Sequence, residues 1–259
     1  MFSQEARCIY RANQLAEVIC QLRFPEILSI ATTIPDKFQE TIRAEFPLYT
    51  KRQELPLPRP GALSGNLPLP KPEPTVNHQF ASADGIWRVN LTSKFISLSC
   101  TKYVRWEEFA GKLDKPLAAF IRIYQPAFLE RVGLRYVNFI SRDALKLSDV
   151  PFRELISPCY LGPMAEDDIP EQNCTRCSVD ADMGLRGGCR VKVHAGPGMV
   201  TRNGKADKEA KFIFDLDLYM PGQVPVNASA GALQTLHAQA YAIFRGAITD
   251  KLHDALDPQ

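Results

Sequence analysis

Several segments of this chain alternate apolar and polar residues with a period of two, and this pattern restricts the fold more than any other feature. In Glu17–Phe24, for example, Val18, Cys20 and Leu22 share one face. Successive side chains of a β-strand point to opposite sides, so the alternation predicts strands with one buried and one solvated face. Sheets of this kind are usually antiparallel. Further strands are expected at 78–82, 87–92, 95–100, 131–140, 177–183, 189–195 and 212–220.

Apolar residues at helical spacing predict three helices between and after these strands. The first begins near Pro35 and ends before Pro47. The second follows Tyr103 and contains Pro116, which predicts a break and a fresh start near Asp114. A long amphipathic helix is expected over the last part of the chain, from about residue 230 to residue 256.

The order of these elements indicates the fold class. We expect an α+β fold with a largely antiparallel sheet, helices packed on one face and a long C-terminal helix. The chain is interpreted as a single domain, 1–259, in two similar helix-plus-strands halves, 1–105 and 106–259. The order of elements is the basis for the two halves, which show no sequence similarity to each other.

A proline-rich run occupies residues 55–75 and reads LPLPRPGALSGNLPLPKPEPT. Proline removes a backbone donor and favours polyproline II geometry, so an extended loop is expected here. The loop is interpreted either as a stiff surface connection or as a ligand for a proline-binding partner. In the second interpretation the contact residues are Pro56, Pro58, Pro60, Pro68 and Pro70.

Charge and apolar runs restrict the partners and the compartment. The formal net charge is +2, which is too close to balance for a densely basic phosphate-binding surface. Charged residues interrupt the N-terminal segment, so neither a signal peptide nor a membrane span is expected. We therefore expect a cytoplasmic protein without a membrane partner, whose seven cysteines stay reduced.

Phrases along nearly the whole chain resemble one protein family. They are QLAEVICQLRFP (which contains EVICQLRFP), FQETIRAEFP, a Tyr-x-x-Trp-Glu-x-Phe stretch at 103–109, ERVGLRYVNFI (which contains GLRYVN) and LHAQAYAIFRGAITDKL in the C-terminal amphipathic helix. They are similar to a sporadically distributed family of uncharacterised bacterial and archaeal proteins of about this length. The resemblance implies no activity, because the function of the family is unassigned. Its sporadic distribution associates it with mobile or defence genes.

Four residues carry metal-binding atoms within about twenty positions: Cys174, Cys177, Cys189 and His194. The predicted register of the 177–195 hairpin opposes this zinc site, since it separates Cys177 from Cys189 by about six residues, or ~20 Å. Buried cysteines acting as small apolar side chains are the favoured interpretation. Zinc stays open as an alternative, and no cofactor is expected.

Four aspartates form a second candidate metal site, which would suit a metal-dependent hydrolase: Asp180, Asp182, Asp215 and Asp217. The strand between them carries Arg190, Lys192 and His194 on the corresponding face. The predicted register places Asp182 opposite Arg190 and Asp180 opposite Lys192, which would give a solvated stripe of charge pairs. The stripe explains these residues without a metal.

No catalytic residue is assigned from the sequence, because the common nucleophile, phosphate-binding and metalloprotease motifs do not occur in it. His237 and His253 are explained by the polar face of the last helix. The segment 196–208 is expected to be a hairpin loop whose Arg202, Lys205 and Lys208 would contact phosphate or only solvent.

These observations favour a non-catalytic accessory or regulatory protein that binds another protein in a bacterial antiviral-defence (CRISPR-like) or stress-response system. The docking surface is expected at the proline-rich loop or at the irregular segment 141–175. Two alternatives stay open: a nucleic-acid-binding protein that uses the 196–208 hairpin, and a metal-dependent hydrolase. The oligomeric state is not predicted.

Overall fold

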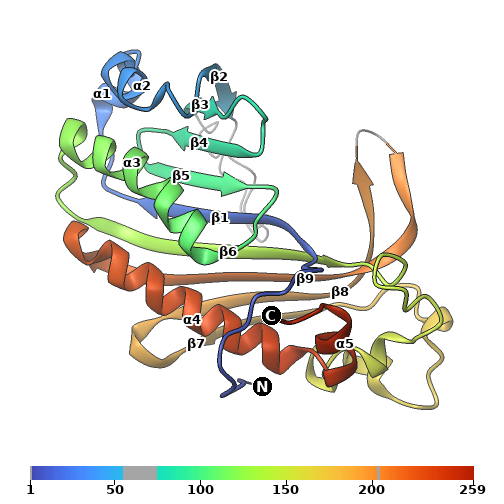
Figure 1. Ribbon diagram of the computed structural model, residues 1–259. Helices are drawn as coiled ribbons and strands as arrows, with labels where there is room; N and C mark the ends of the chain where they lie inside the picture. The colour runs from blue at the N-terminus through green and yellow to red at the C-terminus, as the bar shows by residue number, and fades with distance from the viewer. Residues whose placement is uncertain (1, 55–74, 203–204) are drawn as a thin grey trace, which may run out of the picture.

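A nine-stranded antiparallel sheet forms the framework of the protein in the computed structural model (Figure 1), which describes residues 2–54, 75–202 and 205–259. The strand order across the sheet is β2-β3-β4-β5-β1-β6-β9-β8-β7. The strands are β1 (Leu15–Arg23), β2 (Leu48–Glu54), β3 (Thr75–Ala81), β4 (Trp87–Leu91), β5 (Phe95–Cys100), β6 (Leu129–Ile140), β7 (Val179–Gly184), β8 (Arg190–Arg202) and β9 (Lys205–Val224). The α+β class predicted from the alternation is confirmed.

Five α-helices accompany the sheet in the described part of the chain: α1 (Leu28–Thr32), α2 (Asp36–Ile42), α3 (Trp106–Tyr124), α4 (Ser229–Ala247) and α5 (Asp250–Ala255). Helices α3 and α4 lie side by side over the same face of the sheet (Figure 1). None of the described helices is both long and apolar enough to cross a membrane.

The chain traces the same path twice. Each pass begins with a central strand of the sheet, and the next strand lies at an outer edge. The following strands then fill the space between that edge and the central strand, and the last of them pairs with the central strand. A 19-residue helix follows each pass. In the first pass β1 is joined by β5 and then α3, and in the second β6 is joined by β9 and then α4. The two central strands pair antiparallel with each other, with Cys20 opposite Leu134. The boundary between halves at residues 105 and 106 stays a prediction.

One face of the sheet is buried beneath the helices, as the alternation requires. Val18, Cys20 and Leu22 of β1 are at most 1% exposed, and Leu134 beside them is fully buried. Burial raises the pKa of the Cys20 thiol to about 12, so this cysteine packs as a small apolar side chain. The opposite face, which we call the outer face, carries the polar residues of the same strands.

The predicted break at Pro116 is wrong, because α3 runs from Trp106 to Tyr124 without interruption. A proline inside a helix removes one backbone hydrogen bond and costs about 3 kcal/mol. Phe109 and Phe120 are fully buried on the same side of α3, with the proline itself buried between them. Burial of each such ring contributes about 1.5–3 kcal/mol, so packing outweighs the lost hydrogen bond.

The C-terminal helix is also shorter than predicted, because α4 ends at Ala247 and α5 begins at Asp250. The link between them is extended at Ile248, which forms a β-bridge with Ile156. The Thr249 hydroxyl accepts from the backbone N–H of Leu252 at 3.4 Å and caps α5. Tertiary pairing therefore ends a helix that the apolar periodicity alone would continue.

The segment 141–175 is irregular as predicted, and it forms four short 3₁₀ turns, η1 to η4 (Phe152–Glu154, Pro158–Tyr160, Gly162–Ala165 and Glu171–Asn173). Its apolar side chains are buried, however, including Phe152, Leu155 and Tyr160. The Tyr160 ring meets Phe214 of β9 edge to face, with centroids 5.0 Å apart. The segment completes the core of the second half, and its role as a docking surface stays a prediction.

Two further elements differ from the sequence prediction. Strand β2 was not predicted, and it pairs along its whole length with β3. The segment expected as a loop at 196–208 is mostly strand, because β8 extends to Arg202 and β9 begins at Lys205. The proline-rich run lies largely outside the described residues, including Pro56, Pro58, Pro60, Pro68 and Pro70.

Replacement of Leu134 by alanine tests the central strand pairing. Leu134 is fully buried in β6 between β1 and β9, so we expect Leu134→Ala to lower the free energy of unfolding by about 2–5 kcal/mol. Val137→Ala, on the outer side of the same strand, should cost about 1 kcal/mol or less. Urea denaturation followed by circular dichroism measures both, and equal losses would contradict the assignment of faces.

Candidate functional site

Charged side chains cross the outer face of the second half in alternating rows, and we call them the charge ladder. Strand β6 contributes cations, β9 anions, β8 cations and β7 anions. Its members are Arg131, Arg135, Asp215, Asp217, Arg190, Lys192, His194, Asp180 and Asp182. All of them except Arg131 and Arg190 border a shallow depression of about 570 Å³. The stripe predicted for β7, β8 and β9 thus continues onto β6.

Three of the four aspartates are paired with arginines, and the fourth lies beside His194. Arg135 contacts both carboxylate oxygens of Asp215, at 2.8 and 2.5 Å, and Arg131 contacts Asp217 at 2.5 Å. At the edge, Arg190 contacts Asp182 at 2.9 Å, and His194 Nδ1 lies 2.7 Å from Asp180. The hydrogen bonds that Arg135 donates to Asp215 raise the pKa of Arg135 above its usual value. These pairs neutralise the carboxylates that a metal-dependent hydrolase would need.

The predicted register of the β7–β8 hairpin is wrong by two residues. Asp182 lies opposite Lys192 and Asp180 opposite His194. The turn spans 185–189 instead of 184–188, and it is closed by a bond of 2.7 Å from the N–H of Leu185 to the carbonyl of Cys189. A shift of two residues keeps each side chain on its face, so the charge pattern survives although the partners change.

The four residues of the zinc alternative are not brought together. Cys189 is buried on the helix side, while His194 points from the outer face toward Asp180. Cys177 is half-buried, and its thiol donates to the carbonyl of Leu161 at 3.2 Å. Within the described residues, no three histidine, cysteine or acidic side chains are grouped closely enough to hold a metal ion.

Beyond the sheet, the β8–β9 hairpin continues as a ribbon, which we define as 198–202 paired with 205–211. Pairing of β9 with β6 ends at Phe212, and pairing of β7 with β8 ends at Ala195. Past these points the two strands pair only with each other, and Figure 1 shows them rising away from the body. Arg202 and Lys205 are opposite each other at the tip, and Lys208 is exposed farther down.

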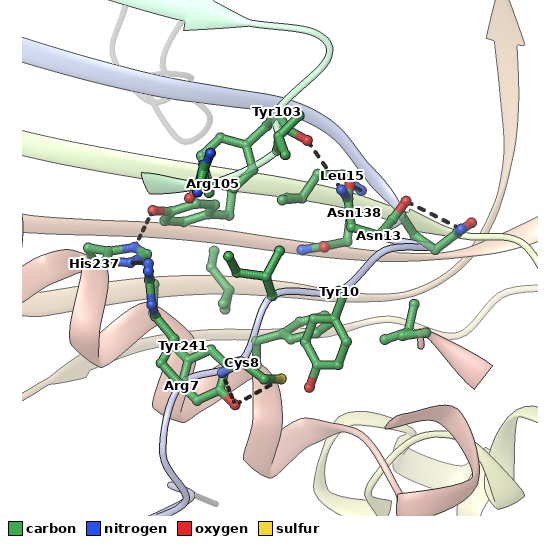
Figure 2. Close-up of a pocket in the computed structure, with 18 residues that line it drawn as sticks. Arg7, Cys8, Tyr10, Asn13, Leu15, Tyr103, Arg105, Asn138, His237 and Tyr241 are labelled. Carbon is green, nitrogen blue, oxygen red and sulfur yellow. Dashed lines mark hydrogen bonds between the residues drawn. The ribbon is translucent and has the colours of Figure 1, made fainter. Parts of the chain in front are cut away.

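A cavity of about 100 Å³ lies on the helix side, at the seam where the two halves meet (Figure 2). We call it the seam cavity. The N-terminal segment, the link before α3, strands β6 and β9 and helix α4 form its walls. The residues that line the cavity include Arg7, Cys8, Tyr10, Tyr103, Tyr136, Asn138, His237, Ala240, Tyr241 and Phe244.

A chain of hydrogen bonds runs along one wall of the seam cavity. Arg7 donates to His237 Nε2 at 2.6 Å, and His237 Nδ1 lies 2.7 Å from the Tyr136 hydroxyl. A guanidinium can only donate, so Nε2 must be unprotonated and His237 is neutral, with its proton on Nδ1. The Tyr136 hydroxyl therefore accepts from His237, and the Tyr103 ring lies beside it, with ring centroids 5.9 Å apart.

Burial and charge hold His237 in this neutral state. Desolvation, followed by the charge of Arg7, lowers the pKa of His237 to about 4. The indole ring of Trp106 stacks on the imidazole, with centroids 4.6 Å apart. Arg7 is itself neutralised by Glu107 at 2.5 Å. The neutral imidazole is thus held between an aromatic ring, a guanidinium and a phenol.

The N-terminal segment closes the seam cavity because the C-terminus holds it in place. The backbone of Ile9 bonds to Gln259 in both directions, at 3.3 and 2.8 Å. The Tyr10 hydroxyl lies 2.8 Å from His253 Nδ1. The Tyr241 hydroxyl lies 3.5 Å from the Cys8 thiol. The two ends of the chain therefore form one strap over the cavity, which we define as residues 7–13 with 256–259.

Sequence reasoning missed the seam cavity. His237 was placed on the polar face of the last helix, but it is 7% exposed. A signal was present, since His237 stands four residues after Leu233 and three before Ala240, within the buried stripe of α4. No sequence signal linked Arg7 to it, because the two residues are 230 positions apart.

Comparison with known proteins gives no functional assignment: no protein-family model matches the chain, and no curated protein matches it significantly.

The protonation of His237 predicts a pH dependence of stability. The folded-state pKa of about 4 lies below the usual value of 6.5, so the unfolded chain binds the proton first as pH falls. The contribution of neutral His237 is complete above pH 6.5 and is lost progressively toward pH 4. Between pH 7.5 and 5.0 we expect a loss of about 2 kcal/mol from this group.

The matched variant is His237→Asn, whose side-chain amide can replace the Nδ1 donor but does not titrate. Urea unfolding of both proteins at the two pH values gives the comparison. The wild type should lose about 2 kcal/mol more than the variant. Parallel losses would show that His237 is not held neutral.

Proposed function

We propose that this chain is a non-catalytic protein that binds another protein, with an accessory or regulatory role in a bacterial antiviral-defence or stress-response system. The observation that carries the proposal is the β8–β9 ribbon. Both of its edges leave the sheet and pair with no other strand of the described chain. Unpaired strand edges are the surfaces by which proteins add a strand from a partner.

The ribbon is suited to a protein partner by its shape and side chains. A two-stranded ribbon alone is marginally stable in water, so a third strand or a covering surface would stabilise it. Met199 of the ribbon is 56% exposed, which is high for an apolar side chain. The ribbon is anchored at one point, where Glu209 accepts from the Ser141 hydroxyl and the Arg142 N–H, both at 2.6 Å.

The charge of the ribbon favours an acidic partner surface. Its two acidic residues are engaged locally, since Asp207 pairs with Lys211 at 2.5 Å and Glu209 binds the turn after β6. Lys208 is exposed and makes no ion pair with the described residues. The biological system is proposed only from the sporadic family that the sequence resembles.

The proposal is tested by isolating the chain from its native host and then reconstituting the complex from purified components. We expect a stoichiometric protein partner whose affinity falls at least tenfold with the double variant Met199→Asp, Lys208→Glu. Lys37→Glu, on the exposed side of α2, is the control and should bind as the wild type does. A chain recovered alone, or equal binding by both variants, would overturn the proposal.

The exposed side chain of Lys208 supports a second candidate, a nucleic-acid-binding protein that uses Arg202, Lys205 and Lys208. Phosphate binding releases counterions, so its affinity falls steeply as salt increases. An electrophoretic shift assay with single-stranded and duplex DNA and RNA at 50 and 200 mM salt measures this. Salt-dependent binding that disappears when the three residues are changed to glutamate would favour nucleic acid over protein.

A further inference from the structure

We propose that the seam cavity is a binding site for a small, uncharged, single-ring aromatic molecule that donates one hydrogen bond, as phenol does. The site is separate from the ribbon and independent of its partner. Three properties of the cavity carry the inference: its aromatic walls, an acceptor oxygen on a buried asparagine that has no donor among the described residues, and the internal neutralisation of its charged residues (Figure 2).

The walls and the volume limit the ligand to one ring. The cavity holds about 100 Å³, which is less than the roughly 150 Å³ of an apolar protein cavity known to hold benzene, so one ring is the upper limit. The Tyr103 and Tyr136 rings meet edge to face at 5.9 Å, and Tyr10 meets Phe244 in the same way at 5.9 Å. Aromatic rings prefer such edge-to-face contacts, which an aromatic ligand would extend.

The buried acceptor is the side-chain oxygen of Asn138 on β6. Asn138 is 4% exposed and lines the cavity, where Figure 2 shows it beside Asn13 and Leu15. Its amide nitrogen donates to the carbonyl of Phe214 at 3.1 Å. Because a carbonyl can only accept, this bond fixes the amide orientation and leaves Oδ1 without a donor among the described residues. Because Asn138 lines the cavity, a ligand hydroxyl placed there can donate to this oxygen.

The remaining polar residues of the wall do not call for a charged ligand. Arg7 is paired with Glu107 and donates to neutral His237. His237 accepts from Arg7 at Nε2 and donates from Nδ1 to the Tyr136 hydroxyl, so both of its ring nitrogens are used. Arg105 also borders the cavity, but it is exposed, so water screens its charge. The interior therefore favours an uncharged ring over a carboxylate.

A ligand in the cavity should stabilise the strap in its closed position. The backbone bonds between Ile9 and Gln259 and between Ala12 and Leu256 keep the N-terminal segment over the cavity. A ligand in contact with Tyr10 and Cys8 packs against the inner side of that segment. Binding stabilises the closed state, because a ligand that binds one state shifts the equilibrium toward it. The strap amides should then exchange with solvent more slowly.

Calorimetry and protein NMR with three probes test the site: phenol, toluene and benzoate. We expect phenol to bind at least tenfold more tightly than toluene and benzoate. In Asn138→Leu, which removes the acceptor but keeps the residue's size, phenol should lose its advantage over toluene. Tighter binding of benzoate than of phenol would assign the contact to Arg105 and would overturn the proposal. An absence of phenol binding at millimolar concentration would also overturn it.

A cavity-filling variant and hydrogen exchange separate specific binding from surface association. Ala240→Leu places a larger side chain in the cavity from α4 and should abolish phenol binding, whereas Ala230→Leu, exposed on the same helix, should leave it unchanged. In the wild type, phenol should slow exchange of the Ile9 and Ala12 amides at least threefold. Unchanged exchange with saturating phenol, or full binding by a folded Ala240→Leu protein, contradicts the assigned site.

Discussion

The antiparallel pairing of β1 with β6 is the contact on which the rest of the structure depends. It joins two passes of the chain that follow the same path, and it places Cys20 opposite Leu134 beneath the helices. Because side chains alternate along a strand, this register also fixes which residues face solvent on every strand beyond it. A shift of one residue between β1 and β6 would turn the apolar set of one half to the face on which the other half carries its polar residues.

The charge ladder follows from that one-sided burial. Once Val191 and Leu218 are buried, their neighbours along the strands must face water, where opposite charges on adjacent strands pair. Gly133 on β6 makes room for one of these pairs, since a side chain there would lie 2.2 Å from the Arg131 guanidinium. The guanidinium instead stacks on Tyr219, 4.6 Å from its centroid. The ladder is thus a structural feature of a solvated sheet face.

The seam and the ribbon arise where the two passes stop matching each other. At the seam, the chain ends cover residues from both halves, and the result is an aromatic cavity beside a neutral histidine. At the ribbon, β8 and β9 extend past the ends of β7 and β6, so the outer edges of these two strands have no neighbouring strand among the described residues. In both places, packing within one half no longer determines what a residue contacts.

The sequence by itself determined the fold class, most of the strands and the face on which the charged residues of β7, β8 and β9 lie, because those properties depend on periodicity within short segments. It did not determine the uninterrupted α3 or the end of α4 at Ala247, where packing and a β-bridge outweigh local preference. Nor could it join Arg7 to His237 or leave Asn138 facing a cavity. Those arrangements require residues more than 70 positions apart to meet, and only the tertiary structure specifies such contacts.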